Sequence, residues 1–323
     1  MQLRIGLACA LAALAWASTA PAQAAPYKSL YVFGDSYSDS GNLYALTGGA
    51  LPPSPPYARR FSNGPTAVEY LAANLGIPFT YSLDPARGSK SLNYAIAGAQ
   101  TGTGPSGIGL LNQVSAFAFD VAVHSVSFKP ANTLFVIEGG GNDIFDLIGL
   151  ETPAQIIHDA AANILSEATT LYGLGGRHIG IATLFHIGLT PAGAASGFAP
   201  QLNAIADSLN QAYALDVAGL GAALPGADVF LLNSGPIVNN LIANAAALGF
   251  TNTTAPCLTT QPFSLCGNPD QHVFFDDQHP TTAFAQQLGN RLATQLPEPA
   301  SMVLLGSGLL GLGLWRRRTA ATR

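Results

Sequence analysis

The segment FGDSYSDSGN, residues 33–42, crowds serines, aspartates and glycines into one short stretch. It follows the apolar run at residues 30–33, whose continuity is typical of a strand buried on both faces. In a doubly wound sheet, ligands bind beyond the carboxyl ends of the strands. Ser36 is therefore a candidate nucleophile, although Gly, Asp and Ser also form ordinary turns and helix caps.

Five apolar runs of this kind recur along the chain, at residues 30–33, 91–96, 134–137, 178–184 and 229–232. Between them lie helical patterns at residues 65–75, 110–123, 153–172, 201–224, 236–248 and 281–295. Strands that alternate with helices predict a parallel sheet covered on both faces. We therefore expect one domain with a three-layer α/β/α sandwich and a central, mainly parallel, five-stranded sheet. Because crossovers are right-handed, the carboxyl ends of its strands meet at one edge.

A serine nucleophile needs a base, and the base needs a partner that holds its tautomer. His279 lies in FFDDQHPTTAF, residues 274–284, three residues after Asp276. Two side chains on one tight loop can meet without help from distant packing. Three of the other histidines, His124, His158 and His178, lie at helix or strand positions that are typical of structural histidines.

An acyl-transfer site also needs donors at the place where charge develops on the acyl oxygen. Gly98, in NYAIAGAQTG, leaves a backbone N–H open to close approach. Asn142, in VIEGGGNDIFD, offers a side-chain amide, and the three glycines before it allow a sharp bend. Each residue alone is a weak signal, because Gly and Asn are common in turns.

Four segments carry a resemblance to a known family: FGDSYSDSGN, NYAIAGAQTG, GGND and DDQHPT, in this order. They resemble blocks I, II, III and V of the GDSL family of the SGNH hydrolase superfamily. Residues 57–76 and 268–281 further resemble the branch of plant-type GDSL lipases and bacterial secreted esterases. The resemblance covers nearly all of residues 25–296 and implies an SGNH (flavodoxin-like) fold and a serine esterase or lipase that acts on esters or lipids.

Carried over to this sequence, the resemblance implies Ser36 as nucleophile, His279 as base and Asp276 as its orienting acid. It also implies an oxyanion hole formed by the N–H groups of Ser36 and Gly98 and by Nδ2 of Asn142. Two positions depart from the family pattern. Tyr37 replaces the leucine that gives the family its name, and Asp277 stands where many relatives carry glycine, which leaves open which of the two carboxylates faces His279. We choose Asp276 for its three-residue spacing from His279.

Both ends of the chain predict export. Residues 1–24 have one arginine, an apolar run and a small-residue cleavage site, which is typical of a signal peptide; an uncleaved membrane anchor is the alternative. Residues 297–323, with Pro-Glu-Pro, an apolar segment and an arginine cluster, resemble a PEP-CTERM sorting tail of Gram-negative bacteria. That resemblance implies transient insertion in the inner membrane, processing by an exosortase, and a product in the periplasm, on the outer surface or secreted; an ordinary C-terminal membrane helix is the alternative.

Charge and cysteine content narrow the possible partners. The formal net charge is −5, which argues against nucleic acid as a ligand. Cys9 falls in the predicted signal peptide, whereas Cys257 and Cys266 lie close together in a polar loop of an exported protein, which predicts a disulfide. We expect no cofactor, no bound metal and a monomer.

Three other interpretations compete. The segment GTGPSG, residues 102–107, matches a dinucleotide fingerprint but follows the second strand late. His272, Asp276 and His279 could form a metal site, and the chain could be a non-catalytic surface or matrix protein on the same scaffold. For an esterase, we expect selectivity to lie in loops such as residues 45–56 and 99–108, whose apolar residues favour an acyl pocket.

Overall fold

The computed structural model of the chain describes residues 27–260 and 262–297. The predicted signal peptide and almost all of the predicted sorting tail lie outside these residues. The central sheet contains the strands β1 (Ser29–Phe33), β2 (Thr80–Tyr81), β3 (Leu92–Asn93), β4 (Thr133–Ile137), β5 (His178–Ala182) and β6 (Asp228–Leu232). The predicted parallel α/β sheet is confirmed, but it has six strands rather than five.

The additional strand, β2, lies at the edge of the sheet, in the order β2-β3-β1-β4-β5-β6. All neighbouring strands in this sheet pair in parallel. Without β2 the order is that of a flavodoxin-like sheet, whose ligand site lies where the winding direction reverses. Here that point lies between β1 and β4.

Each inner strand contributes side chains to both faces, because successive residues point to opposite sides. Tyr31 and Phe33 of β1 belong to the larger core cluster, whereas Leu30 and Val32 belong to the opposite one. Two-sided burial explains the continuous apolar runs that identified these strands. Such aromatic and aliphatic side chains each contribute about 1.5–3 kcal/mol when fully buried.

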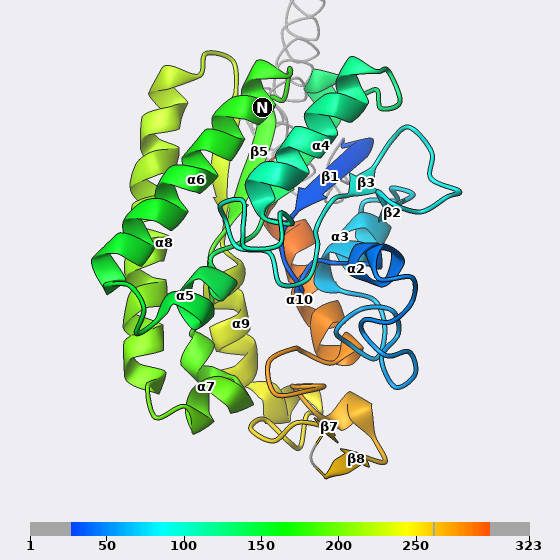
Figure 1. Ribbon diagram of the computed structural model, residues 1–323, viewed down its shortest axis with the longest axis vertical. Coiled ribbons are helices and arrows are strands. Elements are labelled where there is room, and N and C mark those ends of the chain that lie inside the picture. Colours follow the sequence, from blue (N-terminus) through cyan, green and yellow to red (C-terminus); the bar gives the residue numbers. More distant parts are fainter. Residues whose placement is uncertain (1–26, 261, 298–323) are drawn as a thin grey trace, which may run out of the picture.

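Helices cover both faces of the sheet (Figure 1). The larger cluster is formed with α4 (Leu110–Ala122), α6 (Pro153–Gly173) and α8 (Ala199–Ala223). The opposite cluster is formed with α3 (Ala67–Asn74) and α10 (Thr282–Gln295), and α9 (Ser234–Ala243) packs beside α10. Three short helices, α2 (Asn42–Leu46), α5 (Gly141–Leu147) and α7 (Pro191–Ala195), lie in the connections.

Two local features differ from, or add to, the sequence pattern. The helix expected over residues 236–248 ends at Ala243 and is followed by a separate 3-10 turn at Ala245–Leu248. A small antiparallel hairpin, β7 (Leu258–Thr260) and β8 (Phe263–Leu265), lies at the lower end of Figure 1. A disulfide joins Cys257 to Cys266 across the base of this hairpin. Within residues 27–260 and 262–297, the helices are too short or too polar to span a membrane.

Candidate active site

Ser36, His279 and Asp276 form one hydrogen-bonded line. Nε2 of His279 lies 2.7 Å from Oγ of Ser36, and its Nδ1 lies 2.9 Å from each carboxylate oxygen of Asp276. An ionised carboxylate only accepts hydrogen bonds, so Nδ1 carries the ring proton and donates it. The neutral ring then has Nε2 free to accept from the Ser36 hydroxyl, which is the tautomer that a base needs.

Asp276 is buried and remains a carboxylate because it is well supplied with donors. Its Oδ1 accepts from the backbone N–H groups of Gln278, at 2.9 Å, and His279, at 2.7 Å. The hydroxyl of Tyr57 donates to Oδ2 at 2.8 Å. Burial alone would raise the pKa of Asp276, but His279 and these backbone donors outweigh burial and hold that pKa below its ordinary value.

The two adjacent aspartates have different environments. Asp276 is 5% exposed and faces His279, whereas the side chain of Asp277 is exposed. The backbone carbonyl of Asp277 accepts from the N–H of Ala192, which orients this part of the loop. The structure therefore places Asp276, the residue chosen from its spacing, against the imidazole.

Asp39 connects the turn after β1 to the Gly98 loop. Its carboxylate accepts from the backbone N–H groups of Gly41, Asn42 and Leu43 and, at 2.9 Å, from that of Ala97. Gly98, which follows Ala97, has φ +83°, a backbone conformation that residues other than glycine rarely adopt. Four donors to one buried carboxylate thus fix the Gly98 amide relative to the turn that carries Ser36.

Asn142 approaches the same loop from the other side. It lies in the first turn of α5, and its Nδ2 donates to the carbonyl of Ala99 at 2.8 Å. A primary amide has two N–H groups, so the second can donate elsewhere. Gly140, just before α5, has φ +107°, and a Cβ there would lie 2.8 Å from Leu209 Cδ2. The predicted sharp bend is confirmed, and glycine is required at position 140 by both backbone and packing.

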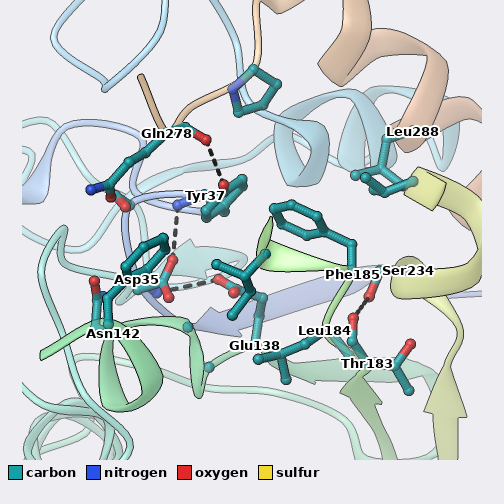
Figure 2. Close-up of a pocket in the computed structure, with 18 of the residues that line it drawn as sticks. Asp35, Tyr37, Glu138, Asn142, Thr183, Leu184, Phe185, Ser234, Gln278 and Leu288 are labelled. Atoms are coloured by element: carbon teal, nitrogen blue, oxygen red, sulfur yellow. Dashed lines mark hydrogen bonds between the residues drawn. The ribbon is translucent and has the colours of Figure 1, made fainter. Parts of the chain in front are cut away.

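Tyr37 connects the turn that carries Ser36 to the loop that carries His279. Its hydroxyl donates to the backbone carbonyl of Gln278 at 2.6 Å (Figure 2). Its ring lies 5.6 Å from that of His279 and 5.4 Å from that of Phe185, measured between centroids. A leucine at position 37 could fill part of this space but could not supply the hydrogen bond. The substitution that separates this chain from the family pattern therefore adds a direct link between the turn that carries Ser36 and the loop that carries His279.

A carboxyl pair lies close to Ser36, with Asp35 buried and Glu138 half-buried. Oε2 of Glu138 accepts from the Ser38 hydroxyl at 3.0 Å and from the N–H of Asp35 at 3.3 Å (Figure 2). Burial, followed by the neighbouring Glu138, raises the pKa of Asp35 well above its ordinary value. Burial also raises the pKa of Glu138. Nothing in the sequence pattern indicated this pair, because Glu138 and Asp35 are 103 residues apart.

Replacing Glu138 by glutamine should make stability less dependent on pH. A carboxyl whose pKa is raised by folding stabilises the fold below its unfolded pKa of about 4 and loses that contribution as pH rises through its folded pKa. Melting curves between pH 4 and pH 8 should therefore show a smaller decline for Glu138→Gln than for the wild type. Each proton that the folded state binds in excess of the unfolded state changes the free energy of unfolding by about 1.4 kcal/mol per pH unit. Glu151→Gln, at an exposed position, is the control; parallel curves for Glu138→Gln and wild type would contradict the expectation.

A cavity opens beside Ser36, with an empty volume of about 900 Å³ when space open to solvent is counted. Its lining comes from the ends of β1, β4 and β5, from α9 and from α10 with the loop before it. Neither residues 45–56 nor residues 99–108 contribute to that lining. Leu46 and residues 106–108 instead line a separate hollow with Leu83, Tyr94 and Phe119, so the expectation that these two loops determine selectivity stays a prediction.

The metal-site hypothesis for His272, Asp276 and His279 is wrong. Nδ1 of His272 hydrogen bonds to the carbonyl of Ala255, at 3.3 Å, while the other two side chains bond each other. Within the described part of the chain, no three His, Cys, Asp or Glu side chains are grouped so that they could hold a metal ion.

The residues GTGPSG form turns between β3 and α4 rather than opening a helix directly after the first strand, as a dinucleotide fingerprint does.

A parallel α/β sheet that brings a serine, a histidine and an aspartate into one hydrogen-bonded line at its switch point is an arrangement typical of hydrolases. The sequence model of the GDSL-like Lipase/Acylhydrolase family matches residues 30–292, and the chain belongs to that family. The PEP-CTERM protein-sorting motif matches residues 295–318 and indicates export in Gram-negative bacteria. The family supports a catalytic esterase over a non-catalytic surface protein on the same scaffold.

Individual relatives agree with this assignment. A GDSL esterase/lipase of Arabidopsis thaliana is 29% identical over 303 residues, with 78% of each chain covered. A second Arabidopsis GDSL esterase/lipase is 26% identical over 314 residues, which cover 81% of this chain and 84% of the relative. Among solved structures, an acetyl xylan esterase from Geobacillus stearothermophilus aligns with a TM-score of 0.46 at 15% identity, covering 83% of this chain and 96% of that one.

Proposed function

We propose that Ser36 is the nucleophile of this ester hydrolase, with His279 as its general base and Asp276 as the residue that orients His279. The observation that carries the proposal is the 2.7 Å contact between Ser36 Oγ and Nε2 of an imidazole whose other nitrogen is bound by a carboxylate. Contacts of this length are what a base needs to accept the proton of a hydroxyl nucleophile.

The reaction proceeds through an acyl-enzyme. Oγ of Ser36 attacks the ester carbonyl carbon while its proton moves to Nε2 of His279. The imidazolium, stabilised by the Asp276 carboxylate, returns that proton to the leaving alcohol oxygen as the ester C–O bond breaks. A water molecule then attacks the acyl-serine with His279 again as base, which releases the carboxylic acid and restores the Ser36 hydroxyl.

We assign the oxyanion hole to the backbone N–H groups of Ser36 and Gly98 and to the second N–H of the Asn142 amide. Within residues 27–260 and 262–297, no hydrogen bond from the Ser36 or Gly98 N–H to a protein acceptor is present. Donors that are fixed before the reaction and are not already engaged cost no reorganisation when the negative charge develops.

Hydrolysis of p-nitrophenyl esters by the full-length chain tests this function. Activity that depends on Ser36 supports it, and the size of that dependence is argued in the Discussion. Because Ser36, Asp276 and His279 all belong to one chain, the proposed catalytic unit is a monomer.

We further propose that export involves two processing events. A signal peptidase removes residues 1–24, and the C-terminal segment enters the inner membrane transiently before an exosortase processes it. The support is the sorting motif at residues 295–318, together with a disulfide, which forms in oxidising compartments outside the cytoplasm.

Intact-mass measurement of the exported protein from a host with an exosortase tests both events. We expect an N-terminus at Ala25 and loss of the arginine cluster that follows Trp315. Deleting the Pro-Glu-Pro residues should leave the tail attached and the protein in the inner-membrane fraction. An exported protein that retains Arg316 to Arg318 in the presence of the exosortase would contradict the second event.

A further inference from the structure

The exposed surface of the cavity beside Ser36 is mostly apolar, although polar side chains also line it. The apolar side chains include Phe185, Ile187, Val238, Ile242, Phe284 and Leu288. The polar groups of Thr183 and Ser234 are satisfied inside the protein: the Ser234 hydroxyl donates to the Thr183 carbonyl at 2.6 Å, and the Thr183 hydroxyl accepts from the N–H of Gly235 at 3.0 Å (Figure 2). The cavity therefore offers a ligand hydrocarbon contacts and few hydrogen bonds.

We propose that this cavity holds the acyl chain of the substrate, so that the enzyme prefers esters of fatty acids clearly longer than acetate. The inference rests on the proposed function, because it takes Oγ of Ser36 as the atom that forms a bond to the acyl carbon. Ser36 and Asn142 both line the cavity, so a chain attached to the attacked carbonyl can enter it directly.

The residues around the opening assign the cavity to the acyl part of the ester rather than to the alcohol. His279 must deliver a proton to the alcohol oxygen, and it does not line the cavity, whereas Gly139, Gly141 and Asn142, on the oxyanion side, do. The carboxyl groups of Asp35 and Glu138 also lie at the opening. The apolar side chains around these two groups leave a neutral hydrocarbon chain as the best-suited occupant.

Val238 is the residue that we expect to limit chain length. It lies on α9, is 7% exposed, and belongs to a buried cluster with Phe274 and Phe284. A phenylalanine at this position would fill space that the short valine side chain leaves open. An alanine would extend that space.

The experiment compares kcat/KM for p-nitrophenyl acetate, butanoate, hexanoate and octanoate with the full-length chain. Burial of each methylene should raise kcat/KM by about fourfold until the cavity is filled, so octanoate should exceed acetate by at least about tenfold. Val238→Phe should abolish this rise, so that the ratio of the octanoate value to the acetate value falls to about one. Val238→Ala should move the optimum to longer chains, which keeps the test decisive if the larger side chain prevents folding.

Asn240→Phe, at an exposed position of the same helix, is the matched control and should retain the wild-type chain-length profile. A wild-type enzyme that prefers acetate, or a Val238→Phe variant that loses acetate and octanoate activity equally, would overturn the acyl-cavity assignment. Hydrolysis of acetate that depends on Ser36 but does not increase with chain length would overturn only this inference. No Ser36-dependent hydrolysis of any ester would instead overturn the proposed function.

Discussion

Replacing Ser36 by alanine should lower kcat/KM for p-nitrophenyl esters by about 10⁴-fold or more. The substitution removes the only atom that can form the proposed acyl-enzyme, and it leaves His279 bound to Asp276. Oγ of Ser36 is a partly exposed atom whose described contact is with Nε2 of His279. Stability should therefore change by less than about 1 kcal/mol, which thermal melting can verify.

A second serine separates a specific effect from a general one. Ser208→Ala removes a hydroxyl on the exposed side of α8, where it only bonds the carbonyl of Ala204, and should leave kcat/KM unchanged. A fluorophosphonate should label the wild-type chain on the peptide that contains Ser36 and should not label the Ser36→Ala variant. Labelling of another serine, with activity retained in Ser36→Ala, would place the nucleophile elsewhere.

The fold was largely predictable because its inner strands are buried on both faces. The inner strands β1, β4 and β5 and the edge strand β6 are each five residues long and mostly apolar, so each appears as an uninterrupted run. β2, at the opposite edge, was missed because it has only two residues, Thr80 and Tyr81, and both are half-buried. The end of α9 at Ala243 was also missed, because residues 245–248 continue the apolar pattern although they form a separate 3-10 turn.

The site was predictable where the interacting residues are close in sequence. The long-range contacts that support it were not predictable. Asp276 and His279 are three residues apart, so a single loop explains their contact. The Tyr57 to Asp276 bond spans 219 residues and the Tyr37 to Gln278 bond spans 241. A tyrosine hydroxyl carries no signal in the sequence about which distant acceptor it will meet, since that depends on how α3, α10 and the sheet pack together.

These long-range bonds add to the local support of the loop that carries His279. Residues 272–280 form no helix or regular strand, although an isolated antiparallel bridge pairs Phe274 with Pro280. Tyr37 holds one carbonyl of this loop and Tyr57 holds one carboxylate oxygen. Because both tyrosines are fixed by other parts of the fold, the position of His279 relative to Ser36 is determined by tertiary structure and not by the loop alone.

Replacing Asp276 by asparagine should lower kcat by about 10⁴-fold, whereas Asp277→Asn should change it by less than about threefold. An amide in place of the carboxylate can present an N–H to Nδ1 of His279, which favours the tautomer with the proton on Nε2 and removes the base from Ser36. It also leaves the imidazolium of the transition state without a charged partner. Asp277 is the matched control, because it is the adjacent residue, carries the same charge and is exposed.

Coupling between variants distinguishes a catalytic partner from a residue that only stabilises the loop. If Asp276 acts through His279 on Ser36, the double variant Ser36→Ala/Asp276→Asn should be no slower than Ser36→Ala alone, because residues that act as a unit are strongly non-additive. A purely structural role predicts that the two losses multiply. Equal losses in Asp276→Asn and Asp277→Asn, or a larger loss in the latter, would show that the carboxylate facing His279 during turnover is not the one that faces it in this structure.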